Sequence, residues 1–138
     1  MAVRKSVVRH FLACERAETS VDGGDLTLRN LMHAIRLLPQ SSFPYTLPQI
    51  TLVAVVTDGH GDFSFVVEFI TWDENGDERL LKRSKQLKVN LGLDPLVARA
   101  LPLRWTGLVI PGPGLYEFRL VSDGDVLASE ILRWRAIP

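Results

Sequence analysis

The stretch from residue 109 to residue 134 constrains the fold of this chain most, because it predicts a complete β-hairpin. It opens with a rigid corner, Pro111-Gly-Pro-Gly114. Apolar and charged residues then alternate from Tyr116 to Leu120, which is the period-2 pattern of a strand with one buried face. Asp123-Gly124 follows and supplies the positive φ angles of a two-residue turn, and a second strand returns to Trp134.

A regular turn at this point also predicts a register. It sets Leu120 opposite Leu127, and Tyr116 opposite Ile131, on the inward face. The same register places the two acidic residues Glu117 and Glu130 opposite each other on the outside, where like charges repel.

Strands are predicted along most of the chain. Alternation or β-branched runs predict strands over residues 7–15, 50–57, 63–72, 78–91 and 101–110, the fourth of them bent or split near Ser84. Asn75-Gly76 predicts a second tight hairpin. Residues 19–25 and 39–48 carry the glycine and proline of loops.

Residues 28–38 fit two patterns. Leu28, Leu31, Ile35 and Leu38 have helical spacing, with Thr27 as a cap and Pro39 as a stop. At period 2 the same segment is a strand, and we favour a strand because the neighbouring segments are strands. A short helical turn from Asp94-Pro95 to Ala98 is also compatible with the sequence.

About seven to eight strands in sequential hairpins predict an all-β fold, an immunoglobulin-like antiparallel β-sandwich. The 138 residues suffice for one domain, and we find no linker or repeat, so residues 1–138 are predicted to form a single β-sandwich domain.

Charge and composition exclude several classes of function. Sixteen basic and sixteen acidic residues give no net charge, so neither a nucleic-acid partner nor an anionic membrane is expected. No signal sequence or membrane-spanning run is evident, which predicts a cytoplasmic protein. The single cysteine, Cys14, rules out an internal disulfide. Lys82, Arg83, Lys85 and Lys88 form one basic cluster, interpreted as a solvated strand face with a phosphate-binding patch as the alternative.

Candidate site residues are few. Asp58, His60 and Asp62 lie within five residues and are weak candidates for a cation site, but this glycine-rich segment lacks the ligand pattern of a calcium loop and is better explained as a turn. His10 and Cys14 would stand roughly 13 Å apart along a strand, which argues against joint chemistry. No nucleophile, phosphate-loop or zinc motif occurs. We therefore predict no catalytic residue, no cofactor and no metal.

Three tryptophans are candidates for a binding surface. Trp72, Trp105 and Trp134 each fall late in a predicted strand and are expected in the core. If they gather at one end of the sandwich, they would form a binding anchor or a sugar-stacking surface.

Several segments resemble a family. Phe11-Leu-Ala-Cys-Glu15, the proline-containing loop before Ile50, and the final hairpin together resemble a group of small uncharacterised bacterial β-sandwich proteins, a domain of unknown function. The resemblance implies a bacterial sandwich domain and favours strand over helix for residues 28–38. It implies no functional residues.

These observations predict a non-enzymatic protein-interaction module, and the alternative is a small-ligand or carbohydrate-binding sandwich. Two of the predicted strands, residues 50–57 and 63–72, are apolar on both faces, whereas a monomeric sandwich needs only its inner faces apolar. Their surplus residues are the predicted interface, for a partner protein or for a homodimer: Val53, Val55, Val66 and Ile70.

Overall fold

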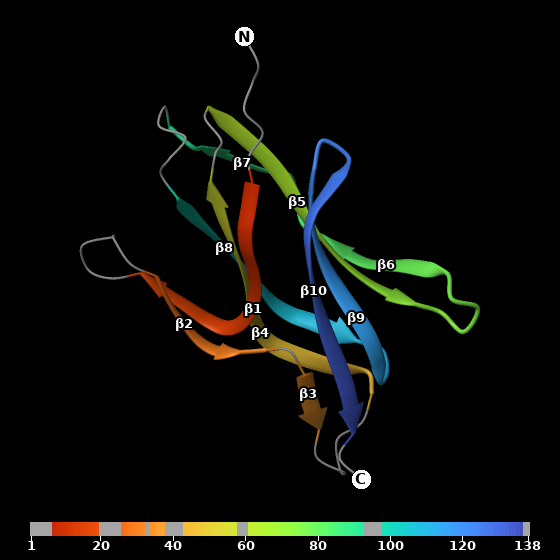
Figure 1. Ribbon diagram of the computed structural model, residues 1–138. Helices are drawn as coiled ribbons and strands as arrows, with labels where there is room; N and C mark the ends of the chain where they lie inside the picture. The colour runs from red at the N-terminus through yellow and green to blue at the C-terminus, as the bar shows by residue number, and fades with distance from the viewer. Residues whose placement is uncertain are drawn as a thin grey trace.

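The chain folds into β-structure alone. The computed structural model describes residues 7–19, 26–32, 34–37, 43–57, 61–92 and 98–136, and these contain strands and no helix, hence none that is long and apolar enough to cross a membrane. The ten strands shown in Figure 1 are β1 (Val7–Thr19), β2 (Leu26–Leu31), β3 (Ala34–Leu37), β4 (Tyr45–Thr57), β5 (Asp62–Trp72), β6 (Glu78–Arg83), β7 (Leu87–Asn90), β8 (Arg99–Ile110), β9 (Gly114–Ser122) and β10 (Asp125–Ala136).

Two sheets form a sandwich, as predicted. The smaller sheet has the order β2-β1-β4-β8, and the larger has the order β3-β10-β9-β5-β6, with β7 pairing the other half of β5 (Figure 1). All pairs are antiparallel except β10 with β3. Strands β1, β4 and β8 occupy the A, B and E positions of an immunoglobulin-like sandwich, and β6, β5, β9 and β10 occupy C′, C, F and G.

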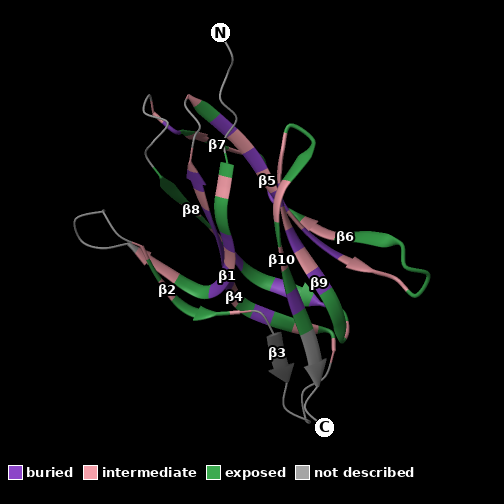
Figure 2. Cartoon of the chain, viewed as in Figure 1, coloured by how far each residue is buried: buried purple, intermediate pink, exposed green. Residues whose placement is uncertain are grey.

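The core lies between the inner faces of both sheets, where strands alternate buried and exposed residues (Figure 2). Phe118 of β9 is fully buried at its centre and stacks on Phe69 with the ring centroids 4.8 Å apart. Trp105 of the opposite sheet packs against the same phenylalanine, with the ring centroids 6.2 Å apart. Aromatic contact thus joins the two layers.

A tyrosine fixes the corner between β8 and β9. The Tyr116 hydroxyl donates to the carbonyl of Gly112 at 2.6 Å and accepts from its backbone N–H at 3.3 Å. A tyrosine at the start of strand F that binds backbone a few residues upstream is the tyrosine corner of immunoglobulin-like sandwiches. Burial raises the pKa of Tyr116, and its hydrogen bond to Gly112 opposes that shift in part.

The predicted hairpin after this corner is confirmed, but its predicted register is wrong. Asp123 and Gly124 have φ angles of 51° and 80°, as the turn requires. Beyond Val126 the pairing slips by one residue, so that Ala128 rather than Leu127 faces Leu120.

The slip is a β-bulge, and it decides which side chains of β10 enter the core. It turns Leu132 inward opposite Tyr116, fully buried, and leaves Ile131 outward opposite Glu117. It also separates Glu130 from Glu117, which removes the like-charge pair of the regular register.

Residues 28–38 contain strand, as favoured, and the helical alternative is wrong. The segment contributes one strand to each sheet. In the smaller sheet β2 pairs with β1, and in the larger sheet β3 runs parallel to β10. The helical turn considered for residues 94–98 falls mostly outside the described residues.

The split predicted near Ser84 is confirmed. Strands β6 and β7 both pair with β5, and Ser84 lies between them, 8% exposed. Its hydroxyl accepts from the Val67 N–H at 2.9 Å and donates to the Lys85 carbonyl at 2.9 Å. The side chain therefore replaces the ladder hydrogen bond that the split interrupts.

The loop predicted for residues 39–48 is shorter than expected. Strand β4 already begins at Tyr45, which pairs with Ile110 of β8, and Leu47 is buried opposite Leu108. Pro48 is tolerated because β4 pairs with β1 only from Thr51 onward, so this half of β4 is a sheet edge. The loop predicted at residues 19–25 lies outside the described residues, apart from Thr19, which ends β1.

Candidate functional site

The weak cation site is described only in part. Asp58 and His60 lie outside the described residues. Asp62 is exposed, forms an ion pair with Lys88 at 3.3 Å and accepts a hydrogen bond from Asn90 at 3.3 Å. In the described part of the chain no three His, Cys, Asp or Glu residues are grouped so as to hold a metal ion. The described contacts of Asp62 thus tie β5 to β7.

The residues His10 and Cys14 differ in their surroundings. His10 is exposed, whereas Cys14 is fully buried and donates from Sγ to the Arg16 carbonyl at 3.4 Å. Burial raises the pKa of the Cys14 thiol, so at neutral pH it stays protonated and weakly nucleophilic.

The four predicted interface residues lie on opposite outer faces of the molecule, so they do not form one surface. Val53 and Val55 project from the smaller sheet, and Val53 is only 2% exposed. Val66 and Ile70 project from the larger sheet, opposite Val121 and Glu117. Ile70 is only 3% exposed.

A network of ion pairs explains why Ile70 is covered. Arg119 of β9 lies 2.7 Å from Glu78 of β6 and 3.0 Å from Glu117. In the β-ladders, Arg119 lies opposite Glu68 of β5, and Glu78 lies opposite Trp72 of β5. The Arg119–Glu78 contact therefore crosses β5 at the level of Ile70.

The charges in this network support one another. Arg119 holds the pKa of Glu78 below its usual range, and Glu78 is the main cause of a raised pKa for Arg119. Arg83 binds Glu68 at 2.6 Å beside them. The outer face of the larger sheet therefore has an ordered, charged centre.

Apolar side chains border this charged centre. Leu80 is 52% exposed, Leu115 is 39% exposed and Ile131 is 44% exposed. The register places Leu80 beside Ile70, and Ile131 beside Glu117, on the same outward face, where Trp72 is half-buried. We call Trp72, Leu80, Leu115 and Ile131 the outer-face patch.

A pocket adjoins the patch at the open flank of the sandwich, between the β5–β6 hairpin and the β8–β9 corner. It has a volume of about 560 Å³ and combines aromatic and proline surface with hydrogen-bonding groups. Its lining includes Trp72, Tyr116, Pro111, Pro113, Glu74 and Arg79. Trp105 does not line this pocket, since it is 7% exposed in the core, and the side chain of Trp134 is outside the described structure.

The basic cluster is largely paired within the chain. Arg83 binds Glu68, Lys88 binds Asp62, and the Lys82 ammonium lies 5.4 Å from the centroid of the Trp105 ring. These contacts favour the interpretation of a solvated strand face over that of a phosphate-binding patch.

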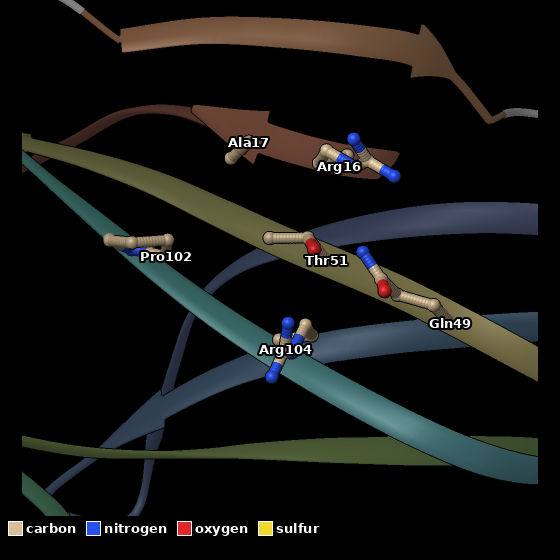
Figure 3. A pocket seen from close by; sticks show the side chains of 6 residues that line it. All are labelled: Arg16, Ala17, Gln49, Thr51, Pro102 and Arg104. Atoms are coloured by element: carbon tan, nitrogen blue, oxygen red, sulfur yellow. The ribbon is translucent and has the colours of Figure 1, made fainter. Parts of the chain in front are cut away.

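A second hollow, of about 420 Å³, lies on the outer face of the smaller sheet (Figure 3). Strands β1 and β4 stop pairing after Cys14 and Thr51, and the hollow follows that divergence. Figure 3 shows Arg16 and Arg104 on either side of the β4 residues Gln49 and Thr51. We call this hollow the sheet pocket, and it is lined by Arg16, Ala17, Gln49, Thr51, Pro102 and Arg104.

Neither the outer-face patch nor the sheet pocket was predicted from the sequence. The patch residues come from four strands and the pocket residues from three, and their grouping depends on strand order, which alternation does not reveal. Only the bulge in β10 exposes Ile131, and nothing in the local sequence marks it. Tyr116 had a usable signal, since it closely follows a proline-glycine corner.

Comparison with known proteins gives a family and a fold. A family model described as a family of unknown function (DUF6941) matches residues 9–133. No curated protein sequence matches the chain.

Among solved structures, the Pseudomonas fluorescens alkylpurine DNA glycosylase AlkC, bound to DNA containing an abasic site analog, is similar with a TM-score of 0.54 at 12% identity; the match covers 98% of this chain and 32% of the glycosylase. A Trichoderma reesei β-D-glucoside glucohydrolase follows with a TM-score of 0.48 at 10% identity, over 98% of this chain and 19% of the hydrolase. The chain thus spans about a third or less of these proteins, and the likeness to the glycosylase shows the fold alone.

Proposed function

Because the chain belongs to a family of unknown function (DUF6941), its role must be argued from its own surface, and we propose that it is a non-enzymatic protein-interaction module that self-associates through the outer-face patch. The observation that supports this is the exposure of Leu80, Leu115 and Ile131 on one sheet face. Grouped apolar side chains on a folded surface mark interaction sites.

The charged centre of the patch favours a second copy as the partner. In a two-fold interface the same surface meets itself, so it has to be self-complementary. Arg119 stands between Glu78 and Glu117, so a rotated copy can set each sign against its opposite. The zero net charge removes long-range repulsion between copies. The proposed interface does not include Val53 and Val55 of the interface predicted from the sequence, because these two residues lie on the other sheet.

Sedimentation velocity over about 1–100 µM tests the proposal. The wild type should show a concentration-dependent dimer, and Ile131→Lys or Leu80→Lys should shift it to a folded monomer, because burying an unpaired ammonium opposes association. Val109→Lys is the matched control, since Val109 is 50% exposed on the smaller sheet and should leave the dimer intact. A wild type that stays monomeric throughout, or a dimer that Val109→Lys also disrupts, would contradict self-association through this patch.

A cytoplasmic location in a bacterium completes the proposal. The one cysteine of the chain is buried and free, as suits a reducing compartment where disulfides are rare. Fractionation of the native host should recover the protein with the cytoplasm, and recovery from the periplasm or the medium would refute this assignment.

The pocket at the open flank supports a second candidate, a small-ligand or carbohydrate-binding sandwich. Trp72 offers an indole ring for stacking, and Glu74 and Arg79 offer hydrogen bonds to hydroxyl groups. Glucose, mannose and their short oligomers should then quench tryptophan fluorescence in the wild type and not in Trp72→Phe. Indifference of the wild type to all of these sugars would eliminate this candidate.

A further inference from the structure

The sheet pocket is a cationic hollow built into the smaller sheet, away from the outer-face patch. Of the described residues that line it, the two charged ones, Arg16 and Arg104, are both basic, and none is a carboxylate. Arg16 approaches Glu18 at 3.5 Å, but Glu18 lies closer to Arg29, at 3.1 Å. Among the described residues no carboxylate is within ion-pair distance of Arg104. Two guanidinium groups therefore border one hollow with little internal compensation.

The floor of the pocket contains a buried hydroxyl. Thr51 is 3% exposed, and its hydroxyl reaches the Glu15 carbonyl only at 3.5 Å, the outer limit of a hydrogen bond. Ser84, the other buried polar side chain of the described residues, makes hydrogen bonds of 2.9 Å. Buried hydroxyls normally find a close partner. The hydroxyl of Thr51 thus gives up only a long hydrogen bond if it turns its single donor to a molecule in the pocket.

The divergence of two strands keeps the hollow open. After the Cys14–Thr51 pair, β1 pairs only with β2, and the Gln49 amide bridges the gap by donating to the Glu15 carbonyl at 3.0 Å. Arg104 is held on the other side by its ladder partner Thr51. The arginines consequently project from strands that the sheet itself holds in place.

From this arrangement we infer that the sheet pocket binds a phosphate group, free or as the phosphomonoester of a small molecule. Guanidinium groups pair with phosphate oxygens in bidentate geometry, and a hydroxyl donor such as Thr51 completes the set. Two positive charges match a phosphate dianion better than a carboxylate monoanion. The volume of about 420 Å³ exceeds that of one phosphate and leaves Pro102 and Ala17 as apolar surface for an organic group.

Calorimetric titration with inorganic phosphate, phenyl phosphate and benzoate tests the inference. Phenyl phosphate should bind most tightly and benzoate most weakly, and added salt should weaken the binding. Binding should also weaken as the pH falls below the second phosphate pKa of about 6, because the dianion gains a proton. Equal affinity for benzoate and phenyl phosphate, or no binding of either phosphate at about 10 mM, would overturn the inference.

Variants locate the site. Arg104→Gln and Arg16→Gln should each weaken phenyl phosphate binding roughly tenfold or more, and Thr51→Val, which keeps the shape of the side chain, should weaken it to a lesser degree. Arg99→Gln is the matched control, since it removes the same charge from the same strand outside the pocket. Circular dichroism and thermal unfolding verify that each variant is folded. Equal losses in Arg99→Gln and Arg104→Gln would show nonspecific charge attraction and contradict a site.

Discussion

At the scale of single residues, the Tyr116 hydroxyl stabilises the β8–β9 corner. Its two contacts with Gly112 close the loop that precedes β9. Tyr116→Phe removes these bonds and keeps the ring, so it should lower the free energy of unfolding by about 1–2 kcal/mol. Chemical denaturation measures this, and equal stabilities for wild type and variant would contradict a structural role for the hydroxyl.

The same residue predicts a pH dependence. Since burial raises the pKa of folded Tyr116, its contribution is complete below the unfolded value of about 10 and is lost as the pH rises through the folded value. The stability difference between wild type and Tyr116→Phe should therefore be larger at pH 8 than at pH 11. A difference that stays constant between the two would refute this linkage.

Gly124 shows how a backbone angle, and not space, restricts a position. Its φ is 80°, and a Cβ atom placed there would meet nothing within 4 Å. Gly124→Val should nevertheless cost about 1–2 kcal/mol, because a β-branched residue is strained at positive φ. Asp123→Asn is the control, since asparagine tolerates this region and should leave the melting temperature nearly unchanged. Equal melting temperatures for wild type and Gly124→Val would disprove the strain.

At the scale of elements, Ser84 allows one strand region to divide in two. Ser84→Ala leaves the Val67 N–H buried without its partner at the β6–β7 split, which should cost about 1–3 kcal/mol. Hydrogen exchange should be faster at the Val67 amide. Ser129→Ala, at an exposed position of β10, should have no effect. Unchanged exchange at Val67 in Ser84→Ala would show that the hydroxyl is dispensable.

The sequence allowed most elements to be predicted and little of how they combine. Alternation revealed β5 and β9, and turn residues located both hairpins, because these signals are local. The bulge at Leu127 was not predictable in this way, because no glycine or proline marks it, and the core position that it gives Leu132 depends on tertiary packing. The Arg119–Glu78 contact joins residues 41 positions apart across an intervening strand, so it required the strand order.

At the scale of the whole molecule, Phe118 couples the two layers. It is fully buried and touches aromatic rings of both sheets. Phe118→Ala should lower the free energy of unfolding by about 3–5 kcal/mol, and circular dichroism and tryptophan fluorescence should report one shared transition. Val126→Ala, at a side chain that is 54% exposed, should change it by less than about 0.5 kcal/mol. Separate transitions for the two signals in Phe118→Ala would show that the sheets unfold independently.

The parallel pairing of β3 with β10 has a consequence for the order of events during synthesis. Ala34 pairs with Arg133, so the two strands are separated by roughly 100 residues of chain. At about 5–20 residues per second, a ribosome needs on the order of 5–20 seconds to make the second strand after the first. During that interval the backbone of β3 has no neighbour among the described strands of its own sheet, and the nascent chain offers an open template to any extended segment nearby. The synthesis of β10 therefore ends the period in which β3 is exposed to mispairing.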